Sequence, residues 1–132
     1  MTDGSALAAL LADSGPAGTW VAGAIAGAGL AAPQLALFEA ANVLRRQEMS
    51  GAIDHTQATL CHADLLVLPV QLWPYPPVAE RAWQLRHTLT AYDASYIALA
   101  ELLGATMITL DRRLAKAPGP RCPVRAFGQA KP

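Results

Sequence analysis

The chain has 132 residues, with 53% hydrophobic and 15% charged side chains, a composition that excludes an intrinsically disordered protein. The formal net charge is zero, but seven of the ten acidic residues lie within residues 1–80 and eight of the ten basic residues within residues 81–132. This asymmetry allows a basic patch for nucleic acid, although pairing between the two halves explains it as well. The length predicts a single domain over residues 1–132.

Helical and strand-like segments alternate along the chain. Apolar residues at helical spacing, with glycine and proline at the ends, predict helices over residues 5–13, 17–29, 34–50, 53–66, 76–87 and 93–104, and one helical turn over 112–116. Short apolar stretches predict strands at residues 30–33, 66–72, 106–110 and 123–127, the second at a sheet edge because Pro69 interrupts it. Helices interleaved with short strands predict an α/β sandwich on a small parallel sheet.

The chain shows no sign of a secreted or membrane-bound protein. Its opening residues lack the basic and long apolar regions of a signal peptide, and its most apolar stretch is too short to span a bilayer. Cys61 and Cys122 lack metal-type spacing, which argues against a zinc site or a disulfide scaffold. We therefore expect a cytoplasmic protein that does not associate with membranes.

Residues 92–114 combine a helix, a glycine stop and a buried strand, with Asp93 and Asp111 at the two ends. A helix of about ten residues travels roughly 15 Å, and a strand of about five residues travels roughly 16 Å back. Both acids should therefore return to one edge, outside the carboxyl ends of the strands, where α/β sheets place ligands. Two carboxylates there repel each other unless a cation lies between them. Taken alone, Asp93 and Asp111 are also explained as helix caps.

Two further acids extend this set. Glu39 lies in residues 35–44, which are apolar almost all round and predict a helix buried on most faces. A charge there is costly unless it is paired or binds a metal, and no cation follows three or four residues later in the helix. A salt bridge to a distant arginine, or a narrow exposed face, explains Glu39 equally well. Asp3 is either another helix cap or a fourth acid at the same edge.

Four short motifs carry a resemblance to a known family: Asp3-Gly4-Ser5-Ala6-Leu7, Glu39 with Asn42 and Arg45-Arg46, Tyr92-Asp93-Ala94-Ser95-Tyr96 with Ala98, and Thr109-Leu110-Asp111 with Leu114. In these motifs, and across nearly the whole chain, the sequence resembles the PIN-domain ribonucleases and more closely the VapC toxins of bacterial toxin–antitoxin pairs. That family usually has several apolar β-branched residues before the first Asp, where this chain has only Met1 and Thr2. Either the start is trimmed or wrongly assigned, or the central strand is a stub.

The resemblance implies a PIN-like three-layer α/β/α sandwich with a small, mostly parallel central sheet. It also implies an Mg²⁺- or Mn²⁺-dependent endoribonuclease that forms a homodimer and is inhibited by a cognate antitoxin. Water would attack the RNA phosphodiester in line, leaving 5′-phosphate and 3′-hydroxyl ends. The expected catalytic and metal-binding residues are Asp3, Glu39, Asp93 and Asp111, because hard cations prefer carboxylate oxygens.

Other residues near these acids have weaker assignments. Ser5 and Thr109 are expected to orient the acids through their hydroxyl groups, although turn and strand roles explain them equally well. Arg112, Arg113 and Lys116 are expected to hold RNA phosphates, although an exposed basic face explains them equally well.

Three rival functions stay open at this point. One is a housekeeping RNA-processing PIN nuclease, and a gene for a short DNA-binding antitoxin beside this one would argue against it. Another is a catalytically idle PIN-like module that binds RNA or protein, which an absence of Mn²⁺ binding would favour. The third is a receiver-like signalling domain, which needs paired acids directly after the first strand.

Overall fold

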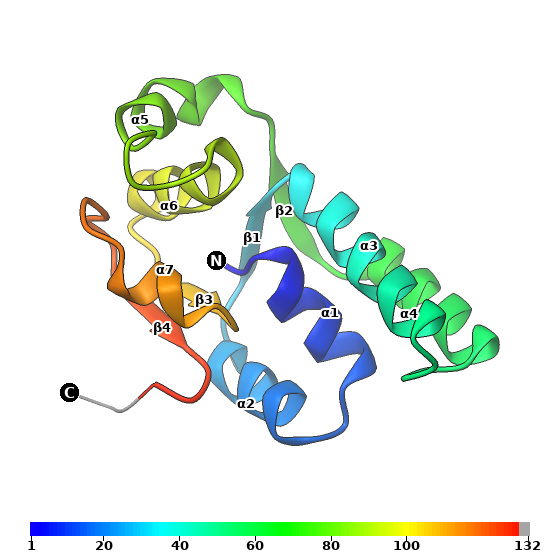
Figure 1. Ribbon diagram of the computed structural model, residues 1–132. Helices are drawn as coiled ribbons and strands as arrows, with labels where there is room; N and C mark the ends of the chain where they lie inside the picture. Colours follow the sequence, from blue (N-terminus) through cyan, green and yellow to red (C-terminus); the bar gives the residue numbers. More distant parts are fainter. Residues whose placement is uncertain (130–132) are drawn as a thin grey trace.

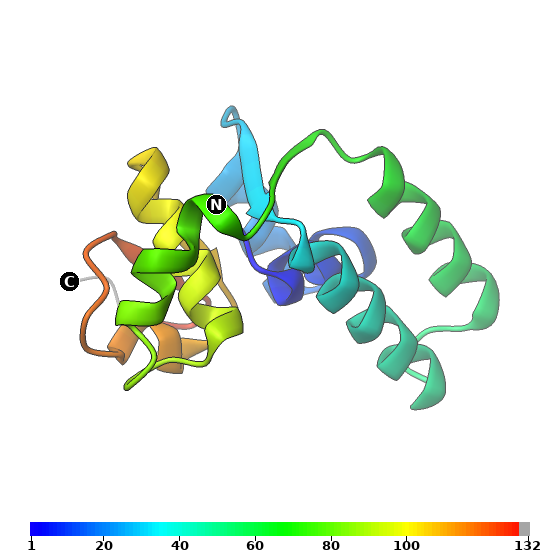
Figure 2. The ribbon, with the colours of Figure 1, turned by 90° about the horizontal axis from the view of Figure 1, so that it is seen from above.

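The computed structural model describes residues 1–129, so residues 130–132 of the predicted domain lie outside the described residues. Within them, α5 and α6 lie on one side of the short strands β1 and β2, and α3 and α4 lie on the other (Figures 1 and 2). The elements are α1 (Gly4–Ala12), α2 (Pro16–Ile25), β1 (Leu30–Pro33), α3 (Leu35–Met49), α4 (His55–Val67), β2 (Val70–Trp73), η1 (Pro76–Val78), α5 (Ala79–Gln84), α6 (Ala91–Leu103), β3 (Met107–Thr109), α7 (Arg112–Lys116) and β4 (Val124–Ala126). Over residues 1–129, no helix combines the length and the hydropathy needed to cross a bilayer.

The first two residues join two small parallel ladders. β1 pairs with β2 and β3 pairs with β4, in both cases parallel. Thr2 forms a parallel bridge with Ile108, whose N–H donates to the Met1 carbonyl at 2.8 Å, and the Thr2 N–H donates to the Ala31 carbonyl at 3.4 Å. Met1 and Thr2 therefore act as a stub strand between β1 and β3, giving the order β2, β1, stub, β3, β4.

Two predicted boundaries in the middle of the chain are wrong. The strand expected over residues 66–72 begins only at Val70, because α4 continues through Val67. Pro69, which has no N–H to donate, separates the helix from the strand. The helix expected over residues 76–87 is a 3₁₀ turn followed by α5, which ends at Gln84.

The expected burial of α3 is also wrong in part. Ala36, Ala40 and Leu44 are buried, as an inward-facing stripe should be. Phe38, by contrast, is 79% exposed. The helix is therefore covered along one side only, and its apolar composition overstated its burial because composition does not tell which side is covered.

An ion pair fastens α5 to α6 and to the loop before β4. The Arg81 guanidinium donates to Glu101 at 2.7 Å, and the Arg121 backbone N–H donates to the same carboxylate at 2.7 Å. Burial acts to raise the pKa of Glu101, but these hydrogen bonds and the two arginine charges together lower it below its usual value. The ionised carboxylate is thus stabilised by folding.

We expect Glu101→Gln to reduce the free energy of unfolding by about 1.5–3 kcal/mol at neutral pH, the range for hydrogen bonds to charged groups. The pKa of Glu101 is lower in the folded protein than in the unfolded chain, where it is about 4.3. The stabilisation by Glu101 is therefore complete at pH values above the unfolded-state pKa, and it is lost as pH falls through the folded-state pKa. Melting curves from pH 7 to pH 3 test it, with the exposed Glu80→Gln as control. A difference in melting temperature that does not shrink at low pH would contradict the assignment.

Candidate functional site

One hollow gathers the four acids that the sequence singled out. It has a volume of ≈ 330 Å³ and is called the acid pocket below. Its lining residues are Asp3, Ser5, Glu39, Asn42, Val43, Arg46, Asp93 and Asp111. The acids come from separate parts of the chain: the residue before α1, the second turn of α3, the first turn of α6 and the residue before α7. The predicted return of Asp93 and Asp111 to one edge is therefore observed, and Asp3 and Glu39 join them.

Asp3 is the most enclosed of these acids, with 8% of its surface exposed. It caps α1 by accepting from the Ala6 N–H at 2.9 Å, and the same oxygen accepts from the Ser5 hydroxyl at 2.7 Å. Its second oxygen accepts from the Thr109 hydroxyl, which in turn accepts from the Asp111 N–H at 2.9 Å. Asp3 is therefore both a cap and a pocket acid, and Ser5 and Thr109 hold its orientation.

Glu39 is held by a buried tyrosine. The Tyr96 hydroxyl, from α6, donates to Glu39 at 2.8 Å. Burial and the charge of Glu39 raise the pKa of Tyr96 far above its usual value, so the phenol stays protonated and keeps donating. Among residues 1–129, the ion pairs do not include Glu39, so the distant salt bridge considered for it is not formed.

Asp93 is not the N-cap of α6, although its position in the sequence suggested that role. α6 begins earlier than expected, at Ala91, and the Thr90 hydroxyl accepts from the Asp93 N–H at 3.1 Å as the N-cap. The helix dipole stabilises a negatively charged carboxylate in the first turn of a helix. The hydroxyl of Thr90 therefore does the capping, and the Asp93 side chain lines the acid pocket.

Asp111 is the N-cap of α7, as expected, and it also forms an ion pair with Arg113. It accepts from the Arg113 backbone N–H at 2.9 Å, and the Arg113 guanidinium donates to both of its oxygens, at 3.1 and 2.9 Å. Arg112 donates to the Phe127 carbonyl at 3.3 Å, and Lys116 is exposed. Of the three basic residues expected to hold RNA, Arg113 thus lies against a pocket acid and Arg112 against the backbone.

The electrostatics of the acid pocket favour a cation. Burial raises the pKa of Asp3, Glu39 and Asp93, and the charges of neighbouring pocket acids raise each of them further. The Arg113 hydrogen bonds lower the pKa of Asp111 below its usual value. Three of the carboxylates are therefore destabilised in their charged form, and a positive ion would relieve this.

The donor set fits a hard divalent cation, since Mg²⁺ and Mn²⁺ prefer carboxylate oxygens. Nevertheless, within residues 1–129 no three acidic, histidine or cysteine side chains are close enough to share an ion as they now stand. Three of the four carboxylates already accept hydrogen bonds from protein side chains: Asp3 from Ser5 and Thr109, Glu39 from Tyr96, and Asp111 from Arg113. A cation at Asp111 would compete with the Arg113 guanidinium, which donates to both oxygens of that carboxylate.

Three residues of the site were not assigned a role from the sequence. Asn42 and Arg46 line the acid pocket three and seven residues after Glu39, on the same face of α3. Tyr96 is 1% exposed, and its hydroxyl donates to Glu39. Their helical spacing would have identified all three from the sequence. Asn42 and Arg46 follow Glu39 on one helix face, and Tyr96 lies three residues after Asp93.

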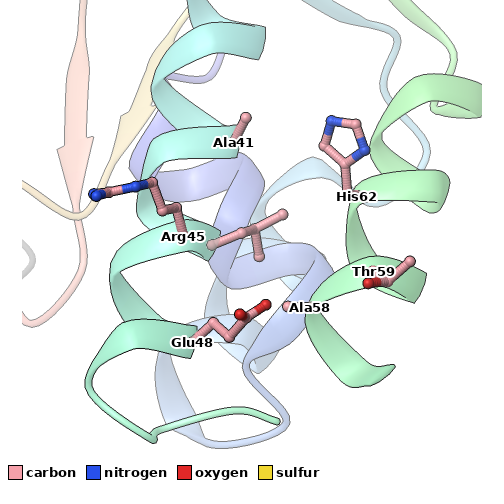
Figure 3. Close-up of a pocket in the computed structure, with 7 residues that line it drawn as sticks. Ala41, Arg45, Glu48, Ala58, Thr59 and His62 are labelled. Carbon is pink, nitrogen blue, oxygen red and sulfur yellow. The ribbon is translucent and has the colours of Figure 1, made fainter. Parts of the chain in front are cut away.

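A different hollow lies between α3 and α4 and contains none of the predicted site residues (Figure 3). Glu48 extends into it from α3, and His62 lines it from α4. This hollow contains a single carboxylate, whereas the acid pocket contains four, so it has fewer ligands for a divalent cation.

Comparisons with known proteins identify a family and relatives of this chain. The chain matches the family model described as PIN domain over residues 1–120, a span that includes all four pocket acids. It is 38% identical over 104 residues to Ribonuclease VapC12 of Mycobacterium tuberculosis, covering 79% of this chain and 81% of the relative. It is 41% identical over 95 residues to Ribonuclease VapC1 of the same organism, covering 71% of each.

A solved structure supports the architecture. The crystal structure of PAE2754 from Pyrobaculum aerophilum matches with a TM-score of 0.64 and 27% sequence identity, covering 93% of this chain and 80% of that chain. The predicted α/β sandwich with a small parallel sheet is thereby confirmed.

Proposed function

Because the chain belongs to the PIN-domain family, among the VapC ribonucleases, we propose that it is a toxin endoribonuclease that needs Mg²⁺ or Mn²⁺ and is inhibited by a cognate antitoxin. The observation that carries the metal-dependent part is the convergence of Asp3, Glu39, Asp93 and Asp111 on one hollow. Structural carboxylates rarely gather in this way, because mutual repulsion opposes it.

In this proposal the four carboxylates hold the cation, and the residues around them fix the orientation of the carboxylates. When bound, Mg²⁺ or Mn²⁺ supplies Lewis-acid chemistry, withdrawing charge from the phosphate and making water a better nucleophile. Ser5 and Thr109 fix the orientation of Asp3, and Tyr96 fixes that of Glu39. The exposed Arg46 at the pocket wall is suited to a phosphate oxygen of the RNA.

The same acids would repel RNA when no cation is bound. Ionised carboxylates in the acid pocket and the phosphates of the RNA backbone are both negatively charged. Arg113 offers partial compensation, since it can leave Asp111 for a phosphate once a cation takes its place. Activity should consequently depend on the divalent ion for substrate binding as well as for chemistry.

We expect the purified protein to cleave single-stranded RNA in Mg²⁺ or Mn²⁺ and to leave 5′-phosphate and 3′-hydroxyl ends. Excess EDTA should remove the activity, and renewed Mn²⁺ should restore it. Titration calorimetry with Mn²⁺ alone provides a readout independent of cleavage. Heat of binding without cleavage of any RNA would contradict the nuclease proposal, and no heat of binding would point to an idle PIN-like module.

The antitoxin part of the proposal has its own test. A short DNA-binding protein encoded beside this gene, added in equal amount to the purified enzyme, should stop cleavage. Cleavage that continues in a stable complex with that protein would argue instead for an RNA-processing nuclease.

A further inference from the structure

We propose that Phe38 and Tyr92 form a binding site for an unpaired RNA base beside the acid pocket, an inference that rests on the proposed function. The two rings line a hollow of ≈ 510 Å³, here called the base hollow. Leu35, Glu39 and Asn42 complete its lining. Its volume falls in the range of roughly 300–1,000 Å³ typical of small-molecule sites.

Neither ring is explained by the packing of the fold. Phe38 is 79% exposed and Tyr92 is 65% exposed, so both leave most of their aromatic surface in water. Each directly precedes a pocket acid, Glu39 in the case of Phe38 and Asp93 in the case of Tyr92. The rings and the carboxylates are thus carried by the same turns of α3 and α6.

The base hollow adjoins the acid pocket. Glu39 and Asn42 line both, so the two hollows share a wall. An RNA strand with a phosphate at the acids would bring a neighbouring base over the rings. Asn42 can donate and accept hydrogen bonds, as the edge of a base requires.

A third hollow, of ≈ 260 Å³, continues the series beyond Phe38. Leu35 and Phe38 line it from one side, together with Trp73 and the 49% exposed Tyr75. Aromatic rings therefore follow one another away from the acid pocket. Proteins that bind single strands stack successive bases on such rings.

RNA explains this arrangement better than a protein partner does. An apolar protein segment would need only the hydrophobic surface, and it would meet charged carboxylates where the base hollow adjoins the acid pocket. A nucleotide has a flat apolar face for the rings and a phosphate for the metal-loaded acids. The shared wall of Glu39 and Asn42 matches that combination.

Fluorescence anisotropy with a labelled single-stranded RNA measures base binding, with Mn²⁺ present and with Asp93→Asn in every protein compared so that cleavage is slow. Phe38→Ala and Tyr92→Ala should each raise Kd by about 5- to 100-fold, the effect of losing one stacked base. Phe38→Trp should restore binding, whereas Phe38→Leu should not. Trp83→Ala removes a ring that is 64% exposed on α5 and lines neither hollow, so it is the matched control.

A sugar–phosphate strand of equal length without bases should bind the parent and Phe38→Ala equally. Parental binding by Phe38→Leu would overturn the proposal, because stacking needs an aromatic ring. Parental RNA binding by Phe38→Ala, with loss of inhibition by the antitoxin, would reassign the surface to that protein. Base-dependent binding in a protein that never cleaves RNA would refute the proposed function and leave the base site standing.

Discussion

Asp93→Asn is expected to reduce RNA cleavage by at least about 100-fold, because a metal site that loses a carboxylate forfeits several kcal/mol of charge stabilisation. Asn is nearly the same shape, and the Thr90 cap of α6 does not use the Asp93 side chain. The fold should therefore persist, and the loss should appear in kcat at saturating Mn²⁺. Asp64→Asn, an exposed acid on α4, is the control.

The stability of Asp93→Asn separates a metal ligand from a structural residue. Burial and the charges of Asp111 and Asp3 raise the pKa of Asp93, so its ionised form is less stable folded than unfolded. A raised pKa disfavours folding once pH exceeds the unfolded value of about 3.9. In EDTA at pH 7 the variant should melt at the same or a higher temperature. Mn²⁺ should stabilise the parent more than the variant. A variant that cuts RNA as fast as the parent would refute the assignment.

Gly4→Ala is expected to lower stability and cleavage together. A Cβ on Gly4 would collide with the Cβ of Glu39 and would lie 2.9 Å from the Ala40 nitrogen. The nearest atoms lie on or next to the backbone of α3, so the conflict is relieved only by moving α1 away from α3. Overpacking of this kind costs about 1–3 kcal/mol.

The same shift would separate two pocket acids. Asp3 directly precedes Gly4, and Glu39 is the residue that the new methyl group would strike. Gly23→Ala is the matched control, because a Cβ there meets nothing within 4 Å, and helix propensity should make it stabilising by about 0.5–1 kcal/mol. Thermal melting and RNA cleavage of both variants test the prediction. A parental melting temperature for Gly4→Ala would show that the α1–α3 contact is not tight.

Local features of the sequence predicted most of the elements. Gly104 ends α6 in a left-handed conformation, as a glycine after an apolar helix should. The alternation of helices with short apolar strands predicted the sandwich. The prediction failed where local signals compete, as at Val67, which suits a strand but completes α4. It also failed at Phe38, because hydrophobic composition does not tell which side of a helix is covered.

The sequence by itself determined which acids stand out and in what order they occur, since a carboxylate in an apolar segment is conspicuous without any structure. Only the tertiary structure decided what each acid touches. The Tyr96–Glu39 hydrogen bond joins residues 57 positions apart, and the Thr109–Asp3 bond joins residues 106 positions apart. Such partners follow from how α1, α3, α6 and β3 pack together, and hydrogen bonds act only over a few ångströms, whereas sequence patterns report spacing along one element.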